Sequence, residues 1–402
     1  MKILQLCHKP PLPQVDGGCI AMHNITQGLL NSGQEVRVLA VTTPKHPVKT
    51  DAFPEEYLQK THFESVFIDT TPKIGTAIGS LFRRQAYQIS RFYSKEMADK
   101  LTRILTSEPF DIVHVESIYM TPYIPVIRKH SKARIVLRMH NIEHLIWERL
   151  ASNERNPFRK WIYKTNCNQL RRVEEHILES VDGYMAISDP DFTYFSTTTP
   201  DVRGTVVPFG IDMKNYEVED DYIPSEKPSL FHIGSMNWSP NVEGMEWFLD
   251  EVWPGIHEQH PELTFTLAGR SIPASILQRH DPNVSIVGAV PSANEFMLDH
   301  DIMIVPLLSG SGIRIKIVEA MALGRVVVTT SVGAEGLSVE NGKHLFIADT
   351  PEEFLSVIDK CIATPDICTI IGENARDIIS VKHNNSIITG KMLDFYQQTL
   401  NS

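Results

Sequence analysis

The sequence contains no apolar run of the roughly 18 residues that a helix needs to cross a lipid bilayer. Its start, Met1–His8, lacks the apolar core of a signal peptide and has the composition of a first buried strand, so we expect a cytoplasmic protein. The five cysteines include no C-x-x-C pair. This spacing favours buried thiols over a disulfide framework or a zinc site, and we expect no bound metal.

Basic residues are too few for a nucleic-acid-binding protein, because the net charge is −11. The excess of acidic over basic residues lies in the second half of the chain. Residues 1–205 contain 26 basic and 22 acidic residues, whereas residues 206–402 contain 12 basic and 27 acidic residues. Opposite signs in the two halves indicate two domains with different partners. The basic first half suits a phosphorylated acceptor, or peripheral contact with the anionic inner face of a membrane.

A length of 402 residues suits two domains of about 200 residues each. Short apolar runs alternate with amphipathic stretches, which is typical of parallel sheets covered by helices. The sequence therefore predicts an α/β protein with two doubly wound, Rossmann-like domains that face a cleft. We place the first domain at residues 1–205 and the second at 206–384, and we expect a last helix at 385–402 to pack on the first domain. The predicted strands are Lys2–Cys7, Glu35–Val41, Asp111–Val115, Arg134–Met139, Tyr184–Ile187, Thr205–Val207, Ser229–Ile233, Thr264–Ala268, Val284–Val287, Asp301–Leu308, Val326–Thr330 and His344–Ile347.

The stretch Pro306–Gly324 has the composition of an anion-binding site. A predicted strand ends in the loop Ser309-Gly310-Ser311-Gly312, and a predicted helix, Ile313–Ala322, then carries Arg314, Lys316 and Glu319. Glycines let the backbone approach a ligand, and the free N–H groups of a helix start and two cations favour an anion. A carboxylate slightly deeper in the helix can accept hydrogen bonds from a ribose diol. The pattern indicates a nucleotide-sugar, although an ordinary strand–loop–helix joint has the same outline.

Other glycine-containing loops follow predicted strands. Gly17 and Gly18 follow the first strand and can present amides to a phosphate or a sugar, although a tight turn before a helix explains the pair equally well. In the second half, three predicted strands end in similar loops. Their candidate ligand contacts are Gly234, Ser235, Gly269, Arg270 and Val290. Ligands in open α/β sheets bind beyond the carboxyl ends of strands, so these loops favour a binding edge.

Histidine and aspartate patterns raise the question of a metal. His140 and Asn141 end a predicted strand and can bond sugar hydroxyls, whereas His140 and His144 have the spacing of a zinc pair without an obvious third ligand. Asp189 and Asp191 form a D-x-D triplet, but capping of a short helix by Ser188 or Asp189 explains it more simply. We interpret both patterns as metal-free.

One further segment, Leu81–Leu105, mixes basic and aromatic residues. A solvated helix face is the default interpretation of such a pattern, and contact with a membrane is the alternative.

Taken together, these residues resemble the GT-B glycosyltransferases, and in particular glycosyltransferase family 4 (glycosyl transferases group 1). The resemblance covers nearly the whole chain. Its motifs include those given above and Asn31–Val41, Val207–Asp212, Glu319–Gly324 and Gly333–Leu337.

The resemblance implies transfer of a sugar from a nucleotide donor (UDP- or GDP-linked), bound by the second domain, to a glycan or lipid-linked acceptor bound by the first. It implies retention of the anomeric configuration, with no metal and no cofactor, since the nucleotide-sugar is a substrate. Arg314 and Lys316 would stabilise the departing diphosphate, Glu319 would hold the ribose, and His140 would orient the donor sugar. The amides around Gly18, Gly312 and Ile313 would complete the cradle.

Two departures from the family pattern stand out. The family's first glutamate would fall at Ser311, and the arginine and lysine common after Gly234 are missing. Arg314 and Lys316 would take over the second role. Because residues two apart do not share a helix face, both reach one diphosphate only if Arg314 lies at the helix entry. The sequence also leaves open a sugar-nucleotide epimerase of the same architecture, or a catalytically silent binding subunit.

Overall fold

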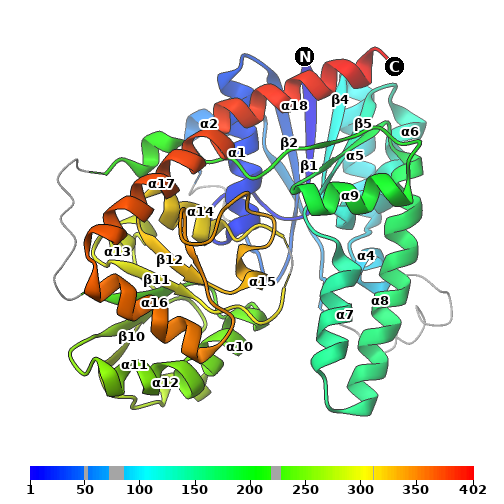
Figure 1. The fold of residues 1–402 in the computed structure, drawn as a ribbon. Helices are drawn as coiled ribbons and strands as arrows, with labels where there is room; N and C mark the ends of the chain where they lie inside the picture. The colour runs from blue at the N-terminus through cyan, green and yellow to red at the C-terminus, as the bar shows by residue number, and fades with distance from the viewer. Residues whose placement is uncertain (49–52, 72–85, 219–227, 311) are drawn as a thin grey trace. The chain divides into compact units, whose positions relative to one another are not determined.

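The computed structural model describes residues 1–48, 53–71, 86–218, 228–310 and 312–402 (Figure 1). The chain forms two compact units. Unit 1 comprises Met1–Gly210 and Asn385–Ser402, and unit 2 comprises Ile211–Asn384. Each unit is built around one parallel sheet with helices packed against it, which confirms the predicted α/β fold with two Rossmann-like domains.

Unit 1 has a seven-stranded parallel sheet in the order β3-β2-β1-β4-β5-β6-β7. The interior strand β1 is buried from Ile3 onward, which is why its residues are mostly apolar. All six strands predicted for this half are confirmed. The strand β3 was not predicted, because an edge strand of composition Glu-Ser-Val-Phe gives little apolar signal. The strands are β1 Lys2–Cys7, β2 Glu35–Thr42, β3 Glu64–Phe67, β4 Ile112–Glu116, β5 Arg134–Met139, β6 Gly183–Ala186 and β7 Gly204–Val206.

The helices of unit 1 include the last helix of the chain, as predicted. This helix, α18, packs closely on α1, since a Cβ at Gly28 would lie 2.1 Å from the Thr389 hydroxyl. Asn385 also donates from its side chain to the Asn24 carbonyl oxygen at 2.7 Å. The helices are α1 Gly17–Asn31, α2 Glu55–Thr61, α4 Tyr87–Ser90, α5 Lys95–Ser107, α6 Ile124–His130, α7 Glu143–Asn153, α8 Pro157–Ile177, α9 Asp189–Thr198 and α18 Asn385–Leu400.

Unit 2 has a six-stranded parallel sheet in the order β10-β9-β8-β11-β12-β13. The predicted strands are again confirmed. They are β8 Leu230–Ile233, β9 Phe265–Ala268, β10 Val284–Gly288, β11 Ile302–Val305, β12 Val326–Thr329 and β13 Phe346–Ile347.

The helices of unit 2 cover a core of buried apolar side chains that includes Trp253, Phe248 and Phe354. The helix predicted from Ile313 begins later, at Ile315, because Arg314 has extended backbone angles (φ −86°, ψ 93°). The helices are α10 Ser239–Trp247, the π-helical turn Phe248–Val252, α11 Trp253–Gln259, α12 Ala274–Leu277, α13 Ala293–Leu298, α14 Ile315–Ala322, α15 Ser331–Ala334, α16 Pro351–Ala363 and α17 Asp366–Lys382.

Each sheet has a point at which the strand order reverses. In unit 1 this point lies between β1 and β4, and in unit 2 it lies between β8 and β11. Loops that leave the carboxyl ends of two such strands run in opposite directions and leave a crevice between them, where ligands of open α/β sheets bind. We therefore expect the site residues of each unit beside this crevice.

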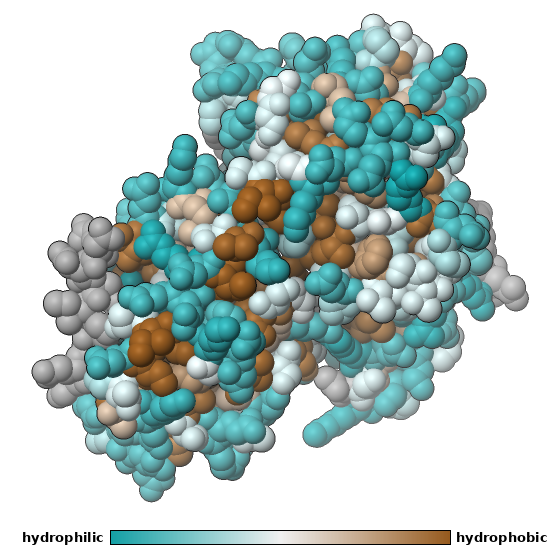
Figure 2. Space-filling model, turned by 45° about the horizontal axis from the view of Figure 1, so that its top comes forward, coloured by the Kyte–Doolittle hydropathy of each residue, from teal (hydrophilic) through white to brown (hydrophobic). Residues whose placement is uncertain are grey.

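None of the helices in the described ranges is both long and apolar enough to cross a membrane. On the face drawn in Figure 2, hydrophilic and hydrophobic side chains are interspersed.

Close backbone packing between α17 and the end of α14 gives a test of the fold of unit 2. A Cβ at Gly372 would lie 2.2 Å from the Gly324 carbonyl oxygen, a backbone atom that cannot move aside. We expect Gly372→Ala to lower the free energy of unfolding by about 1–3 kcal/mol. In α11, a Cβ at Gly255 meets nothing within 4 Å. The control Gly255→Ala should therefore raise stability by about 0.5–1 kcal/mol. Equal urea midpoints for the two variants would contradict this packing.

Candidate functional site

The switch point of unit 2 places both predicted cations at the start of α14. Arg314 is the N-cap residue and Lys316 lies in the first turn. The two residues therefore do not need to share a helix face. The condition set by the sequence, that Arg314 lies at the helix entry, is met.

The Lys316 ammonium group is held by two neutral partners. Its Nζ donates to Asn241 Oδ1 at 2.8 Å and contacts His232 Nε2 at 3.2 Å. His232 Nδ1 lies 2.7 Å from the Ile304 carbonyl oxygen, which can only accept, so we assign the imidazole proton to Nδ1 and a lone pair to Nε2. Burial and the neighbouring Lys316 hold the pKa of His232 well below its usual value, which is consistent with this neutral form.

The charge of Lys316 has no counter-charge among the described residues. No carboxylate described by the structure lies within ion-pair distance of its Nζ. Burial, followed by the positive charge of Arg314, holds the pKa of Lys316 well below its usual value. An anion placed beside both cations would offset these two effects.

Glycine at position 234 leaves room for this arrangement. A Cβ there would lie 3.1 Å from Lys316 Nζ and 3.0 Å from Asn241 Nδ2. Any side chain at this position would therefore press on the ammonium group and on the amide that holds it.

Arg314 is positioned by the loop that precedes it. Its guanidinium lies over the ring of Trp238, 5.3 Å from the centroid, and it donates to the Gly312 carbonyl oxygen. Gly310 has a φ of 118°, and a Cβ on it would lie 2.9 Å from the Trp238 ring. The loop can take this path only with glycine at position 310. Ser311 lies outside the described residues.

Glu319 lies one turn beyond Lys316 and accepts a hydrogen bond from the Tyr216 hydroxyl at 2.9 Å. Tyr216 belongs to the short 3₁₀ helix Met213–Tyr216. Burial raises the pKa of Glu319 to about 7, although the Tyr216 hydrogen bond opposes the shift. The carboxyl group therefore changes its charge near neutral pH.

The remaining candidates of unit 2 lie at the same edge of the sheet. The Ser235 carbonyl oxygen accepts from Asn241 Nδ2 at 2.8 Å, and the Arg270 carbonyl oxygen accepts from the Met236 amide at 2.9 Å. The Arg270 side chain is exposed, and Val290, two residues beyond β10, is partly exposed. Gly312 is buried and Ile313 is partly buried in the loop before α14. The loops after β8, β9 and β11 are thus joined by hydrogen bonds, but no described contact ties Val290 to them.

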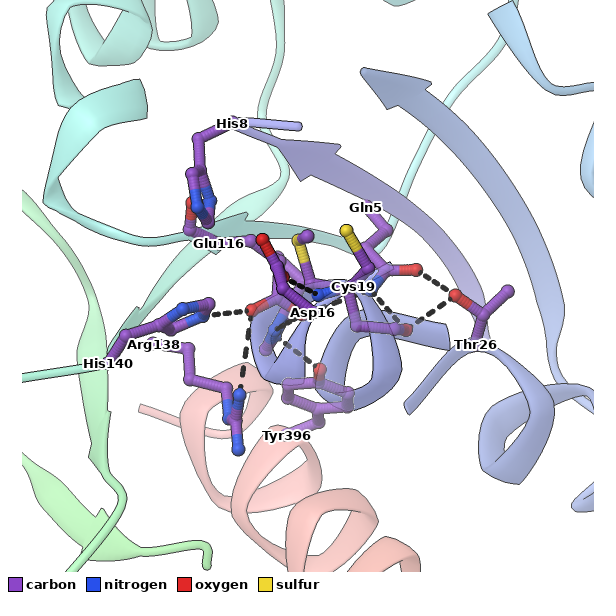
Figure 3. A network of polar contacts seen from close by, with 11 residues as sticks. Gln5, His8, Asp16, Cys19, Thr26, Glu116, Arg138, His140 and Tyr396 are labelled. Atoms are coloured by element: carbon purple, nitrogen blue, oxygen red, sulfur yellow. Dashed lines mark hydrogen bonds and ion pairs between the residues drawn. The ribbon is translucent and has the colours of Figure 1, made fainter. Parts of the chain in front are cut away.

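The switch point of unit 1 contains a buried carboxylate that the sequence analysis missed (Figure 3). Glu116, the last residue of β4, is completely buried. Its Oε2 lies 2.7 Å from His140 Nε2 and 3.7 Å from Arg138 Nη1. Its Oε1 accepts from Gln5 at 2.9 Å and lies 3.1 Å from His114 Nε2.

Glu116 remains ionised and thereby sets the form of His140. Burial opposes ionisation, but His114, His140 and Arg138 outweigh it and hold the pKa of Glu116 well below its usual value. Burial lowers the pKa of His140, so the ring is neutral at pH 7. Because Nε2 faces a carboxylate, we assign the proton to Nε2. This leaves His140 Nδ1 as an acceptor for a ligand hydroxyl.

A second histidine, His8, lies beside His140, with the ring centroids 5.3 Å apart. Its Nδ1 lies 3.2 Å from the Glu116 carbonyl oxygen, which can only accept. We therefore assign the proton of His8 to Nδ1 and the lone pair to Nε2. Burial and the charge of Lys9 hold the pKa of His8 well below its usual value. Unit 1 therefore presents two neutral imidazoles that can each accept a hydrogen bond.

The glycine pair opens α1 as predicted. The helix begins at Gly17, and the Asp16 carboxylate caps it by accepting from the Cys19 amide at 3.0 Å. Lys9 Nζ lies 2.6 Å from Asp16 Oδ1, and a Cβ at Gly18 would meet the same Nζ at 2.6 Å. A cation, two glycines and a helix start thus lie together in the segment that follows His8, at the same switch point.

The patterns that resembled metal sites have other partners. His144 Nδ1 lies 2.6 Å from Glu174 Oε2, and Asn141 donates to Glu143 at 3.3 Å. Ser188 caps α9 by accepting from the Asp191 amide, which confirms the capping interpretation. In the parts of the chain that the structure describes, no three histidine, cysteine or acidic side chains are grouped so as to hold a metal ion.

Comparison with known proteins identifies the type of domain that carries the cation site. Residues 227–364 match the family Glycosyl transferases group 1. The matched segment lies within unit 2 and contains Asn241, Arg314, Lys316 and Glu319. Unit 2 carries a group 1 glycosyl transferase domain. The resemblance predicted from the sequence is therefore confirmed.

Solved structures support the same fold for the whole chain. A sucrose-phosphate synthase from Thermosynechococcus elongatus has a TM-score of 0.71 and 15% identity, and the match covers 99% of each chain. The Anabaena protein HepE, solved in complex with UDP and glucose, has a TM-score of 0.66 and 16% identity over 99% of this chain and 100% of its own. These likenesses confirm the GT-B fold.

A curated relative has a similar length. It is a 44.6 kDa protein in the cps region of Klebsiella pneumoniae, with 23% identity over 357 residues, or 87% of each chain.

Several side chains of the glycosyl transferase domain and of unit 1 were not predicted. Asn241 and His232, which hold Lys316, are separated from it by 75 and 84 residues, so no local pattern joins them. Trp238 and Tyr216 were missed for the same reason. Glu116 and Lys9 had a usable signal, because each polar residue lies just beyond the carboxyl end of a predicted strand.

The buried charges around Glu116 give a second test. Glu116→Ala leaves Arg138 buried without its counter-charge, and we expect it to lower the free energy of unfolding by about 3–5 kcal/mol. Tyr396→Phe removes only one hydrogen bond to His114, which spans 2.7 Å, and should cost about 1 kcal/mol. The double variant Glu116→Gln/Arg138→Met should lose less than Glu116→Ala. Urea unfolding that gives equal losses for Glu116→Ala and Tyr396→Phe would rule out this role of the carboxylate.

Proposed function

We propose that this protein is a retaining glycosyltransferase that moves a sugar from a UDP- or GDP-linked donor to an acceptor in surface-glycan biosynthesis. The acceptor is a glycan, either free or linked to lipid or protein. The observation that carries the proposal is the pair of cations at the start of α14, of which Lys316 has only neutral hydrogen-bond partners among the residues that the structure describes. The complex of HepE with UDP and glucose and the cps-region relative support the donor class and the pathway.

In this mechanism, the diphosphate of the donor binds between Arg314 and Lys316 at the N-terminus of α14. The bond between the anomeric carbon and the phosphate oxygen breaks, and negative charge builds up on the departing diphosphate. Two fixed cations and the amides of a helix start stabilise this charge without reorganisation. Glu319 accepts hydrogen bonds from the ribose diol.

The acceptor hydroxyl attacks from the face that the diphosphate leaves, so the anomeric configuration is retained. The departing phosphate oxygen takes the proton of that hydroxyl, and a new bond forms between the anomeric carbon and the acceptor oxygen. His140 accepts a hydrogen bond from the donor sugar at Nδ1, with Glu116 fixing the tautomer. The amides of Gly17 and Gly18 and the Asn141 side chain assist in binding the sugar.

Substitution of Lys316 tests this function. We expect Lys316→Ala to lower kcat for sugar transfer by about a hundredfold or more, because one cation at the leaving group is lost. Unliganded stability should change little, because the removed group is a partly buried cation with no counter-charge among the described residues. The control Lys343→Ala removes an exposed lysine of the same unit that pairs with Glu340, and it should retain full activity.

The measurement combines two assays. A thermal-shift screen of nucleotide-sugars identifies the donor, since a ligand of the folded state raises the melting temperature. Product analysis with acceptors then measures transfer. Tight donor binding without turnover would instead support the silent binding subunit, and conversion of the donor without an acceptor would support the epimerase. A donor shift of the same size in Lys316→Ala and the native protein would contradict the diphosphate site.

The pH dependence of donor binding tests Glu319. With its pKa raised to about 7, this group is protonated below that pH and ionised above it. A carboxylate can accept both diol hydrogen bonds, whereas a protonated carboxyl can accept fewer. We therefore expect the Kd of a nucleotide-sugar to rise as the pH falls through about 7. Glu319→Gln should bind more weakly and lose this step. A step that persists in Glu319→Gln would assign the titration to another group.

A further inference from the structure

The start of α8 carries an unusual concentration of positive charge. Residues 155–173 contain six basic residues and no acidic residue. Helices α7 and α8 of unit 1 lie side by side (Figure 1), and α8 begins directly after the turn Glu154–Asn156. We define the α8 basic–aromatic surface as Arg155, Phe158, Arg159, Lys160, Trp161 and Lys164.

Two large aromatic side chains of this surface are exposed to solvent. Phe158 is 68% exposed and Trp161 is 54% exposed. Their rings stack on one another with centroids 6.2 Å apart. The opposite side of α8 is buried in unit 1 through Cys167, Leu170 and Glu174. The aromatic pair is therefore directed away from the core.

The positive charges of the surface are not neutralised within the described parts of the chain. Further along α8, Arg171 pairs with Glu148 at 3.2 Å. Arg155, Arg159, Lys160 and Lys164, by contrast, make no ion pair with any acidic group that the structure describes. Cations and exposed aromatic rings thus lie together on the first two turns of α8 and on the segment that leads into it.

The segment that the sequence analysis considered for membrane contact is less suitable. Its described part, from Ala86 onward, includes α5, whose Met97, Leu101 and Ile104 are buried in the core of unit 1. Lys100 pairs with Glu64. Residues 81–85 lie outside the described residues. The apolar side of α5 is therefore occupied by the fold itself.

We propose that the α8 basic–aromatic surface docks unit 1 on an anionic lipid bilayer. The four unpaired cations would meet lipid phosphates, and Phe158 and Trp161 would enter the interfacial layer, where aromatic rings are favoured. Because α8 does not qualify as a membrane span, the contact is peripheral. The inference extends the proposed function to an acceptor that is held at a membrane, but the docking itself requires no nucleotide.

Charge and shape favour a bilayer over other partners. A second copy of the chain that docked through the same surface would bring like charges together, which opposes association. A single nucleic-acid strand is usually held in a groove, with bases stacked on separate aromatic rings. Here the rings stack on each other on one face of a helix.

Co-sedimentation with lipid vesicles tests the proposal. The full chain, without nucleotide, is mixed with vesicles of phosphatidylcholine alone or with about one third phosphatidylglycerol. We expect binding only to the anionic vesicles, with weakening at high salt. The variants Phe158→Ser/Trp161→Ser and Arg159→Glu/Lys160→Glu should each bind at least about tenfold more weakly. The matched controls Ile370→Ser and Lys343→Glu change an exposed apolar residue and an exposed cation of unit 2, and they should bind as the native chain does.

Two further measurements make the result decisive. The variants should retain the native melting temperature and the native thermal shift with the donor sugar, so that a loss of vesicle binding is separate from a loss of folding or of donor binding. Equal vesicle binding by the native chain and both double variants would overturn the proposal. A concentration-dependent dimer that the double variants abolish, without vesicle binding, would assign the surface to a second copy and would also overturn it.

Discussion

A positive charge held by neutral groups is the constraint on which the site of unit 2 depends. Lys316 Nζ is fixed by Asn241 and by the lone pair of His232, and no described carboxylate offsets its charge. Removing such a charge from water costs free energy, and this cost lowers the pKa of Lys316. The arrangement is retained by glycine at position 234 and by a helix that starts after Arg314. These features together favour the binding of an anionic ligand.

Unit 1, by contrast, contains a buried negative charge. Glu116 is surrounded by donors, and its ionised form fixes His140 in the tautomer with a free lone pair at Nδ1. The network reaches α18, since the Tyr396 hydroxyl bonds to His114. The last helix of the chain thereby contributes to the environment of a predicted sugar-binding residue. A neutral, oriented acceptor suits sugar hydroxyls better than a mobile charged group.

The sequence predicted the fold well because buried parallel strands are rich in apolar residues, and each of the twelve predicted strands has a counterpart in the structure. The edge strand β3 was missed because it is short and half polar. Arg314, Lys316 and Glu319 could be proposed from the sequence because their chemistry lies in one local segment. Asn241, His232 and Glu116 act through contacts between distant parts of the chain, which a single sequence does not reveal. The start of α14 was placed too early, since a basic residue at an N-cap gives no capping signal.

The most direct test of the cation site is a crystal structure of the protein with an intact nucleotide-sugar. The diphosphate oxygens should lie within about 3 Å of Lys316 Nζ and of the Arg314 guanidinium, with the ribose hydroxyls on the Glu319 carboxylate. A nucleotide bound elsewhere, or a diphosphate that leaves Lys316 bonded only to Asn241 and His232, would contradict the central claim.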